Sequence, residues 1–310
     1  MAKYVAKRLL QIIPIFFIVS VLIFAIVRMS PTDPVTVILG GKKATAETIV
    51  AAEEKFHREE PIVKQYLNWM GGIFHGDFGI SYKNQESVTT MIAARIPVTL
   101  GLVVLSSLIG SVLGILAGTV CAVKKNTVLD RTISILTIVL VSCPVFLICI
   151  FMILIMAQIP GANFTGTYEN IGEYFSRIWL PSVALSFSLL ALVSRVTRTS
   201  MIKELKSNYI ETAEAKGISR GKIIYRHAFK NAIIPVITVA SIQIGAMVVG
   251  AVLVENVFAL PGLGSLLITG INTSDYPIVQ GIMLLLVAVF LILNLIVDVV
   301  YALVDPRIRY

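Results

Sequence analysis

Long apolar runs alternate with polar stretches along this chain of 310 residues. A helix needs roughly 20 apolar residues to cross the core of a bilayer, and six runs approach or reach that length. The runs cover residues 9–27, 98–123, 133–156, 178–193, 232–254 and 278–297. The pattern therefore predicts an all-α membrane protein with six transmembrane helices and both termini on one side.

The composition agrees with a membrane location. The chain is 56% hydrophobic and only 14% charged, with a mean hydropathy of +0.87, and a soluble domain of this size cannot bury so much apolar surface. The net charge of +8 is typical of basic cytoplasmic loops in membrane proteins, so we expect no nucleic-acid partner. Cys121, Cys143 and Cys149 lie in apolar runs without metal-ligand spacing, which predicts buried thiols and no metal site.

Lysine and arginine gather in the connections on one side of the predicted membrane. They occur at the N-terminus, after the second run, at the C-terminus and, above all, between the fourth and fifth runs. Since such residues mark the cytoplasmic side, both termini and residues 195–231 are expected there. We predict an uncleaved N-terminal anchor helix over 1–28, an extracytoplasmic region with short helices over 29–97, and a five-helix core over 98–310.

The extracytoplasmic region contains two helical patterns. The first covers residues 44–60, and the second begins at Pro61. The glycine-rich stretch 71–79 is expected to be a loop. His57 and His75 are interpreted as ordinary surface or packing residues, because neither has partners at metal-ligand spacing.

The cytoplasmic segment reads YIETAEAKGISRGKIIYRHAFKNAIIP over residues 209–235. A stripe at helical spacing begins at Ile202 and reaches Ala213, and Gly217 is placed to end that helix. Ser219 is a candidate cap for a second helix. That helix would carry a cationic stripe able to lie at the inner headgroups. The stripe consists of Lys222, Arg226 and Lys230.

Two glycine-rich stretches resemble phosphate loops without matching them. Gly217 and Gly221 are separated by three residues where a P-loop has four, and Gly262 and Gly264 lack the third glycine of a dinucleotide fingerprint. No Ser/His/Asp or Cys/His set suggests a nucleophilic site. We therefore expect a chain that is not an enzyme and has no ATPase motif of its own.

Residues 211–217, E-T-A-x-x-x-G, resemble the EAA motif of integral-membrane subunits of bacterial ABC importers. Thr212 stands where the motif usually has its first alanine, and the distance from Gly217 to Pro235 is longer than in the general consensus. Both departures are similar to the dipeptide, oligopeptide and nickel subgroup, whose pattern resembles Y-x-x-T-A-x-A-K-G followed by R-H-x-x-x-N-x-x-x-P. Further matching stretches include RIPVTLGL, ENVFALPGLGSLL, DYPIVQG and the terminal DPRIR.

The ordered combination resembles the first of two permease subunits in such importers, with a type I importer-like fold in the bacterial cytoplasmic membrane. The resemblance implies a second homologous permease, two cytosolic ATPase subunits that bind ATP and Mg²⁺, and an external substrate-binding protein. No cofactor is expected on this chain. It also implies a coupling helix that docks on the ATPase. Its residues would be Glu211, Thr212, Ala213, Ala215 and Gly217.

Polar residues inside the apolar runs are candidates for the transport pathway, because they are costly in a bilayer. Gln243 and Asn294 are of this kind, although hydrogen bonding between helices explains them equally well. At the outer side, the region 29–96 and the loop ENVFALPGLGSLL are where a binding protein would dock, and Glu255 with the PGLG stretch is a candidate for an outer gate. The residues concerned in PGLG are Pro261, Gly262 and Gly264.

Several functions remain open at this point. Peptides are the cargo most typical of the subgroup, and nickel or metal chelates are the alternative. An ion-coupled secondary transporter is a more distant alternative, because such transporters usually have intramembrane acidic residues or an inverted repeat. A membrane enzyme would need a catalytic constellation, and none stands out.

Overall fold

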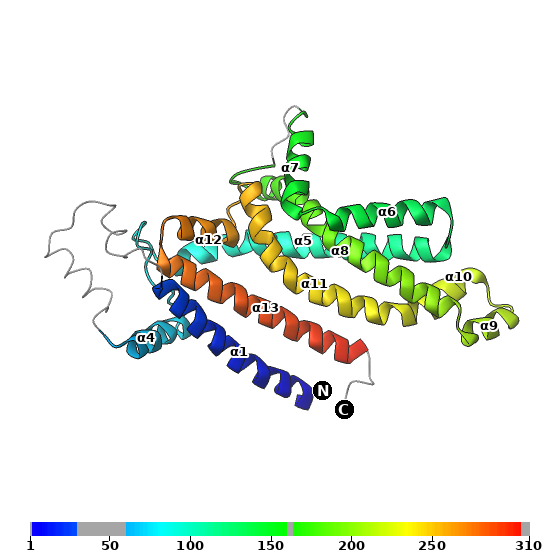
Figure 1. Ribbon diagram of the computed structural model, residues 1–310, viewed down its shortest axis with the longest axis horizontal. Coiled ribbons are helices and arrows are strands. Elements are labelled where there is room, and N and C mark those ends of the chain that lie inside the picture. Colours follow the sequence, from blue (N-terminus) through cyan, green and yellow to red (C-terminus); the bar gives the residue numbers. More distant parts are fainter. Residues whose placement is uncertain (1, 30–59, 160–163, 305–310) are drawn as a thin grey trace. The chain divides into compact units, whose positions relative to one another are not determined.

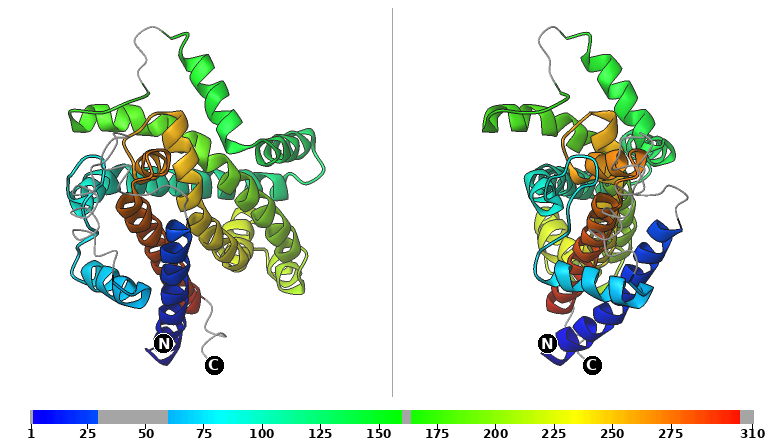
Figure 2. Two further views of the ribbon diagram at one scale, coloured as in Figure 1. Left: turned by 60° about the vertical axis from the view of Figure 1, so that its left-hand side comes forward. Right: turned by 90° about the vertical axis from the view of Figure 1, so that its left-hand side faces the viewer.

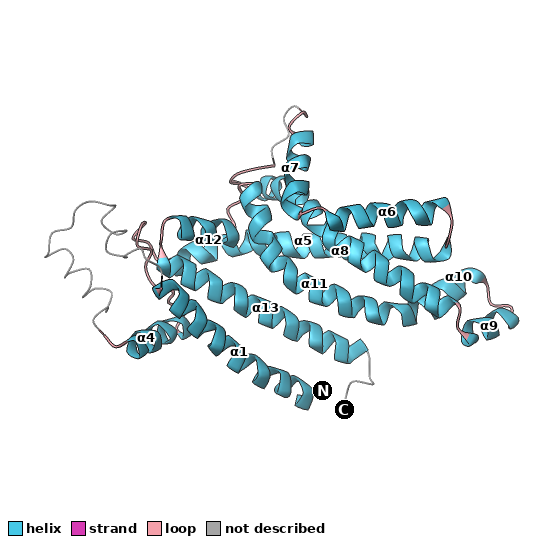
Figure 3. Ribbon diagram, in the orientation of Figure 1, coloured by secondary structure: helices cyan, strands magenta, loops and turns pink. Residues whose placement is uncertain are grey.

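The computed structural model describes residues 2–29, 60–159 and 164–304, and within them helices are joined by turns, as the colours of Figure 3 show. These residues form two compact units. One holds 2–6, 100–159, 164–260 and 292–304, and the other holds 7–29, 60–99 and 261–291. The predicted division into an anchor helix, an outer region and a core uses different boundaries from these two units, and it stays a prediction.

Among the described residues, five helical stretches are long and apolar enough to cross a membrane. They are α1 (Ala2–Arg28), α5 (Val88–Val123), α8 (Ile171–Leu205), the stretch Arg220–Val257 that ends in α11 (Phe229–Val257), and α13 (Tyr276–Val304). A sixth crossing results if α6 (Val128–Ser142) and α7 (Val145–Met156) count as one broken span. The prediction of an all-α membrane protein is confirmed.

The third predicted span is not one continuous helix. α6 and α7 meet at an angle of 106°, and Figure 2 shows α7 turning away from α6 in both views. Pro144 lacks the N–H that would continue the helix, and it pushes the preceding residue out of helical geometry. Cys143 accordingly adopts φ −83° and ψ 128°. Cys143 is also exposed, which corrects the expectation of a buried thiol, whereas Cys121 and Cys149 are buried.

Large apolar side chains cover the outside of these helices. Such a surface would be unfavourable in water and is typical of helices that face lipid or a partner subunit. Examples more than half exposed are Val104, Leu108, Ile135, Phe151, Ile242 and Val249.

In the first unit, α5 and α8 pack with their backbones in close approach. A Cβ on Gly110 would lie 2.9 Å from the carbonyl oxygen of Ser186, and one on Gly118 would lie 2.5 Å from that of Ser194. Gly114 meets the backbone of Leu190 in the same way. The three glycines recur every four residues, so they form one face of α5. α8 is also longer than the predicted span, since it continues into the expected cytoplasmic segment.

The second unit joins α1 to α4 (Ile62–Phe74), and α12 (Leu263–Asn272) to the first turns of α5 and α13. α4 follows Pro61 as predicted, but it includes Gly71 and Gly72, so the expected loop begins only at His75. Ser20 and Tyr66 share a hydrogen bond of 2.7 Å between α1 and α4. The helix expected over 44–60 lies outside the described residues.

Candidate functional site

The sequence-predicted coupling segment forms a helical hairpin at one end of α8 and α11 (Figure 1). α8 ends at Leu205, and a short helix, α9 (Asn208–Ala215), follows after two residues. The chain then turns and returns through α10 (Arg220–Lys222) and a π-helix, η1 (Ile223–Ala228), directly into α11. The predicted continuous stripe from Ile202 to Ala213 is therefore wrong, because the helix is interrupted at Lys206 and Ser207.

The turn after α9 depends on Gly217. Its φ is +74°, in the left-handed region that favours glycine. Its N–H donates to the Glu214 carbonyl at 2.9 Å, and the Ile218 N–H donates to the Ala213 carbonyl at 3.2 Å. These two bonds define a Schellman motif, which satisfies the last carbonyls of the helix. The prediction that Gly217 ends this helix is confirmed.

The inner face of α9 is packed against its own chain. Ile210 and Ala213 are 2% and 6% exposed, in a cluster with Ala122 of α5, Met201 of α8 and Ile223 of η1. This packing fixes the hairpin to several helices without a partner protein. It also corrects the expected geometry of the small face, because Ala213 points into the cluster and Ala215 alone of the two alanines is exposed.

The outer face of α9 is polar or small and open to the surroundings. From Glu211 to the glycine turn, the exposed residues are Glu211, Thr212, Glu214, Ala215, Lys216 and Gly217. We call residues 211–217 the α9 tip. A short helix with a bare glycine turn at its end allows another surface to approach the backbone closely.

Tyr209 connects α9 to the two long helices on either side. Its hydroxyl donates to Glu204 Oε2 of α8 at 2.7 Å and accepts from Asn231 Nδ2 of α11 at 3.1 Å. Burial, reinforced by the bond to Glu204, raises the pKa of Tyr209 above its usual value.

The predicted cationic stripe falls partly in a different helix type, and its lying along one face stays a prediction. Lys222, Arg226 and Lys230 are all exposed. The chain between them is π-helical over residues 223–228, and such segments are frequent at functional sites. Ser219 occupies the cap position of α10, but its side chain makes no cap hydrogen bond, so its expected capping role is wrong.

A partly buried ion pair joins the cytoplasmic ends of α6 and α8. Arg198 Nε and Nη2 donate to Asp130 Oδ1 and Oδ2 at 2.7 and 2.8 Å, and the Asp130 side chain is 3% exposed. The N–H of Asn126, in the turn between α5 and α6, donates to the same carboxylate at 2.9 Å. Bidentate geometry with a further donor is the arrangement in which a buried ion pair is best compensated.

The predicted pathway and gate residues are scattered over several elements. Gln243 on α11 and Asn294 on α13 are half-buried. Glu255 is fully buried in the last turns of α11 rather than outside the span. Pro261 and Gly262 precede α12, and Gly264 lies within it. Their roles in a pathway or gate stay predictions.

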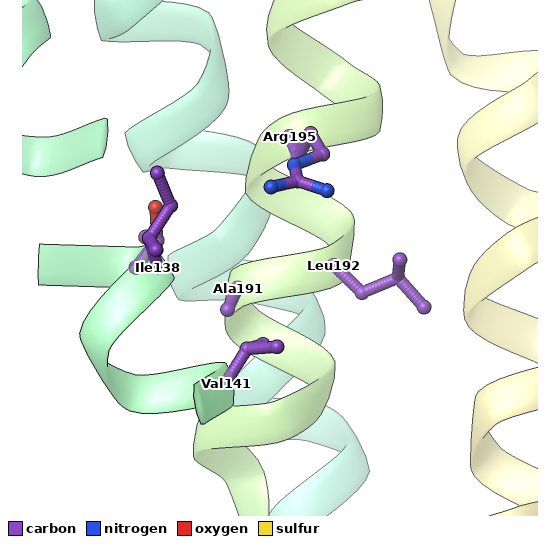
Figure 4. A pocket seen from close by; sticks show the side chains of 6 residues that line it. Ile138, Val141, Ala191, Leu192 and Arg195 are labelled. Carbon is purple, nitrogen blue, oxygen red and sulfur yellow. The ribbon is translucent and has the colours of Figure 1, made fainter. Parts of the chain in front are cut away.

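A small cavity lies between α6 and α8, lined by Thr137, Ile138, Val141, Ala191, Leu192 and Arg195 (Figure 4). Its volume is about 50 Å³, whereas pockets for drug-sized ligands measure roughly 300–1,000 Å³. This cavity is too small for a peptide.

Sequence reasoning missed the contacts that hold this region together. The spacing of Gly110, Gly114 and Gly118 was readable as a repeated small-residue pattern. The partners of Tyr209 and Asp130 were not, because each bond joins residues far apart in the chain.

Comparison with known proteins agrees with this architecture. Residues 110–310 match the model of the family "Binding-protein-dependent transport system inner membrane component", and residues 1–103 match the N-terminal model of the same systems. The chain belongs to this family, and it is a multi-pass permease of the bacterial inner membrane.

Relatives align over the entire chain. The glutathione transport system permease protein GsiC of Escherichia coli K12 is 36% identical over 310 residues, with 100% of both chains covered. The di/tripeptide transport system permease protein DppB of Pseudomonas aeruginosa is 33% identical, covering 100% of this chain and 99% of its own. A probable peptide ABC transporter permease protein, y4tP of Sinorhizobium fredii, is 33% identical with 100% of both covered.

Two solved transporters share the fold. An inward-facing methionine transporter, MetNI, has a TM-score of 0.58 at 19% identity and covers 69% of this chain and 96% of its own. An amino acid ABC transporter with histidines has a TM-score of 0.52 at 16% identity, covering 71% and 95%. The type of fold expected for an ABC-importer permease is confirmed. Family membership sets aside the ion-coupled transporter, and an ATPase and a substrate-binding component accompany permeases of this kind.

Proposed function

We propose that the chain is the permease through which di- and oligopeptides enter the cell, driven by ATP hydrolysis on separate subunits. Three relatives aligned over full length carry names that refer to peptides or to glutathione, itself a tripeptide. Their identity of 33–36% supports a common class of cargo.

In this proposal the chain forms half of the pathway and a second homologous permease forms the other half. The cavity of about 50 Å³ between α6 and α8 is too small for a peptide, and the route for cargo would lie between the two permeases instead. Gln243 and Asn294 would contribute polar groups to that route, and Glu255 with the PGLG stretch would lie near its outer end.

The exposed α9 tip is the single observation that carries the coupling mechanism. Glu211, Thr212 and Ala215 would contact a cleft on an ATPase subunit, and Gly217 would let the two backbones approach. Two ATPase subunits would bind ATP and Mg²⁺, and this chain would hold no cofactor. Their closure would displace α9, whose inner face is packed against α5, α8 and η1.

The displacement would reach the membrane because η1 and α11 follow α10 as one helical stretch, Arg220–Val257. Lys222, Arg226 and Lys230 would hold this stretch at the level of anionic headgroups. A motion of α9 would thus tilt α11, because no flexible loop interrupts the helical stretch between α10 and α11.

The test is uptake by the complete system reconstituted in liposomes, with the permease pair, the ATPases and the substrate-binding protein. We expect ATP-dependent accumulation of labelled di- and tripeptides. Accumulation of Ni²⁺ or a metal chelate, with no peptide uptake, would contradict the proposed cargo. Uptake that persists without the ATPase subunits would contradict the proposed mechanism.

A further inference from the structure

The outer side of the second unit carries a short, strongly hydrogen-bonded turn between α4 and α5. Residues 80–87 form this turn, which we call the outer turn, and Ile80 and Ser87 pair across it as an isolated β-bridge. The Ser81 N–H donates to the Glu86 carbonyl at 2.9 Å, and the Val88 N–H donates to the Gly79 carbonyl at 2.9 Å. The turn is therefore closed at its base.

A buried carboxylate from a distant part of the chain fixes the turn in place. Asp275 precedes α13 and is 0% exposed. It accepts from Ser81 Oγ at 2.5 Å, from the Tyr82 N–H at 3.1 Å and from the Lys83 N–H at 3.2 Å. Bonds to a charged acceptor are stronger than neutral ones, and a carboxylate is costly to bury unless such donors surround it.

The position of Asp275 is itself fixed by the backbone. α12 ends at Asn272, Ser274 follows with a φ of +52°, and the Asp275 N–H donates to the Gly270 carbonyl at 2.8 Å. The segment before the outer turn also packs against the first turns of α13. A Cβ on Gly281 would lie 3.1 Å from Phe78, and one on Gly79 would lie 3.7 Å from Pro277. Contacts with the end of α12 and the start of α13 thus hold the outer turn in position.

The outer turn has a polar, exposed surface. Lys83, Asn84, Gln85, Glu86 and Ser87 all face outward. Gln85 has a φ of +57°, a conformation that costs a non-glycine residue about 1–2 kcal/mol. A strained residue held by surrounding bonds points to a functional constraint, and a preordered surface loses little conformational entropy when a partner binds.

We propose that the outer turn is a docking surface for the substrate-binding protein, and that Asp275 is the residue that positions it. The inference rests on the proposed function, because it requires an external binding protein. The turn lies on the outer side by the topology of α1 and α5. Its two exposed charges of opposite sign, Lys83 and Glu86, suit a polar partner surface with complementary charges rather than lipid.

The test measures the affinity of the substrate-binding protein for the complete transporter in nanodiscs, by biolayer interferometry. Lys83→Glu and Glu86→Lys reverse charges on the exposed turn without touching the bonds to Asp275. We expect each to raise the dissociation constant about tenfold, since like charges at an interface oppose association. Asp275→Asn leaves at least one donor of the turn unpaired and should weaken binding as well.

Lys64→Glu is the matched control. It makes the same charge change on the outer side in α4, where Lys64 pairs with Glu60 four residues away at 2.8 Å, and it should bind as the wild type does. Wild-type affinity in both Lys83→Glu and Glu86→Lys would overturn the docking surface while leaving peptide transport intact. Absence of binding by the wild-type transporter would overturn both. Loss of the second permease from the complex, with unchanged affinity, would assign the turn to a permease contact and also contradict the proposal.

Discussion

The hydroxyl of Tyr209 accepts a hydrogen bond from Asn231 at 3.1 Å, across 22 residues of sequence. The same hydroxyl donates to Glu204 at 2.7 Å. One oxygen atom therefore links α8, α9 and α11, the three elements that the proposed mechanism requires to move together.

Tyr209→Phe removes this oxygen and keeps the ring. The bonds are exposed, and an ordinary hydrogen bond contributes only about 1 kcal/mol net, so the thermal stability of the purified complex should change little. We expect peptide uptake per ATP hydrolysed to fall several-fold, because α9 can then move without carrying both long helices. Uptake per ATP equal to the wild type would show that the link is not needed.

Gly217→Val should disrupt the α9 tip through backbone strain rather than through a clash. No atom lies within 4 Å of a Cβ at this position, but its φ is +74°. A β-branched residue is disfavoured there, whereas asparagine tolerates the conformation. Uptake should be abolished by Gly217→Val and largely kept by Gly217→Asn, with both variants inserted in the membrane. Equal uptake by the two variants would contradict the role of the turn.

Ala213 and Ala215 should respond differently to an introduced charge. Ala213→Asp buries an unpaired carboxylate in the cluster with Ile210 and Met201, so it should destabilise the hairpin and lower expression. Ala215→Asp lies on the exposed face and should leave expression unchanged while reducing copurification of the ATPase. The comparison needs only a membrane blot and a pull-down. Identical behaviour of the two variants would contradict the assigned faces of α9.

Gly118→Ala tests the close packing of α5 on α8. Its new Cβ would lie 2.5 Å from a carbonyl oxygen and 2.6 Å from the Thr197 Cβ, and overpacking of this kind costs about 1–3 kcal/mol. The midpoint of thermal unfolding in detergent should fall. Gly71→Ala is the control, because nothing lies within 4 Å of its Cβ. A midpoint for Gly118→Ala as high as that of the control would disprove the contact.

The ion pair between Asp130 and Arg198 should be strongly coupled. Asp130→Asn leaves a partly buried guanidinium without its charged partner, and breaking such a pair costs about 3 kcal/mol. Replacing Arg198 in the same variant by glutamine should restore part of the loss. A double-mutant cycle on the unfolding midpoint measures this coupling. Strictly additive effects would show that the two residues act independently.

The apolar runs and basic connections predicted the fold class, the topology and the position of α9, because bilayer thickness and charge bias act through local sequence. The break at Cys143 and Pro144 was foreseeable only as a bend, since the angle depends on packing around it. Similarly, Gly217 could be recognised as a helix end from its neighbours in the sequence.

The tertiary bonds could not be predicted in the same way. The link between Ser81 and Asp275 spans 194 residues, and no local pattern indicates such a partner. Ala213 was expected to contact the ATPase because it belongs to the matching motif, whereas in the structure it packs into the cluster with Ile210 and Met201. The π-helix η1 was not predicted either, because the spacing of Lys222, Arg226 and Lys230 fits an α-helix equally well.

The central claim is that the α9 tip touches the ATPase subunit, and a photocrosslink from Ala215 tests it most directly. A benzophenone amino acid would replace Ala215 in the assembled transporter, and a second variant would carry it at Val112, an exposed position of α5 within the span. The account predicts an ATPase adduct from position 215 and none from position 112. A functional, ATP-driven transporter whose position 215 reacts only with lipid or solvent would contradict it.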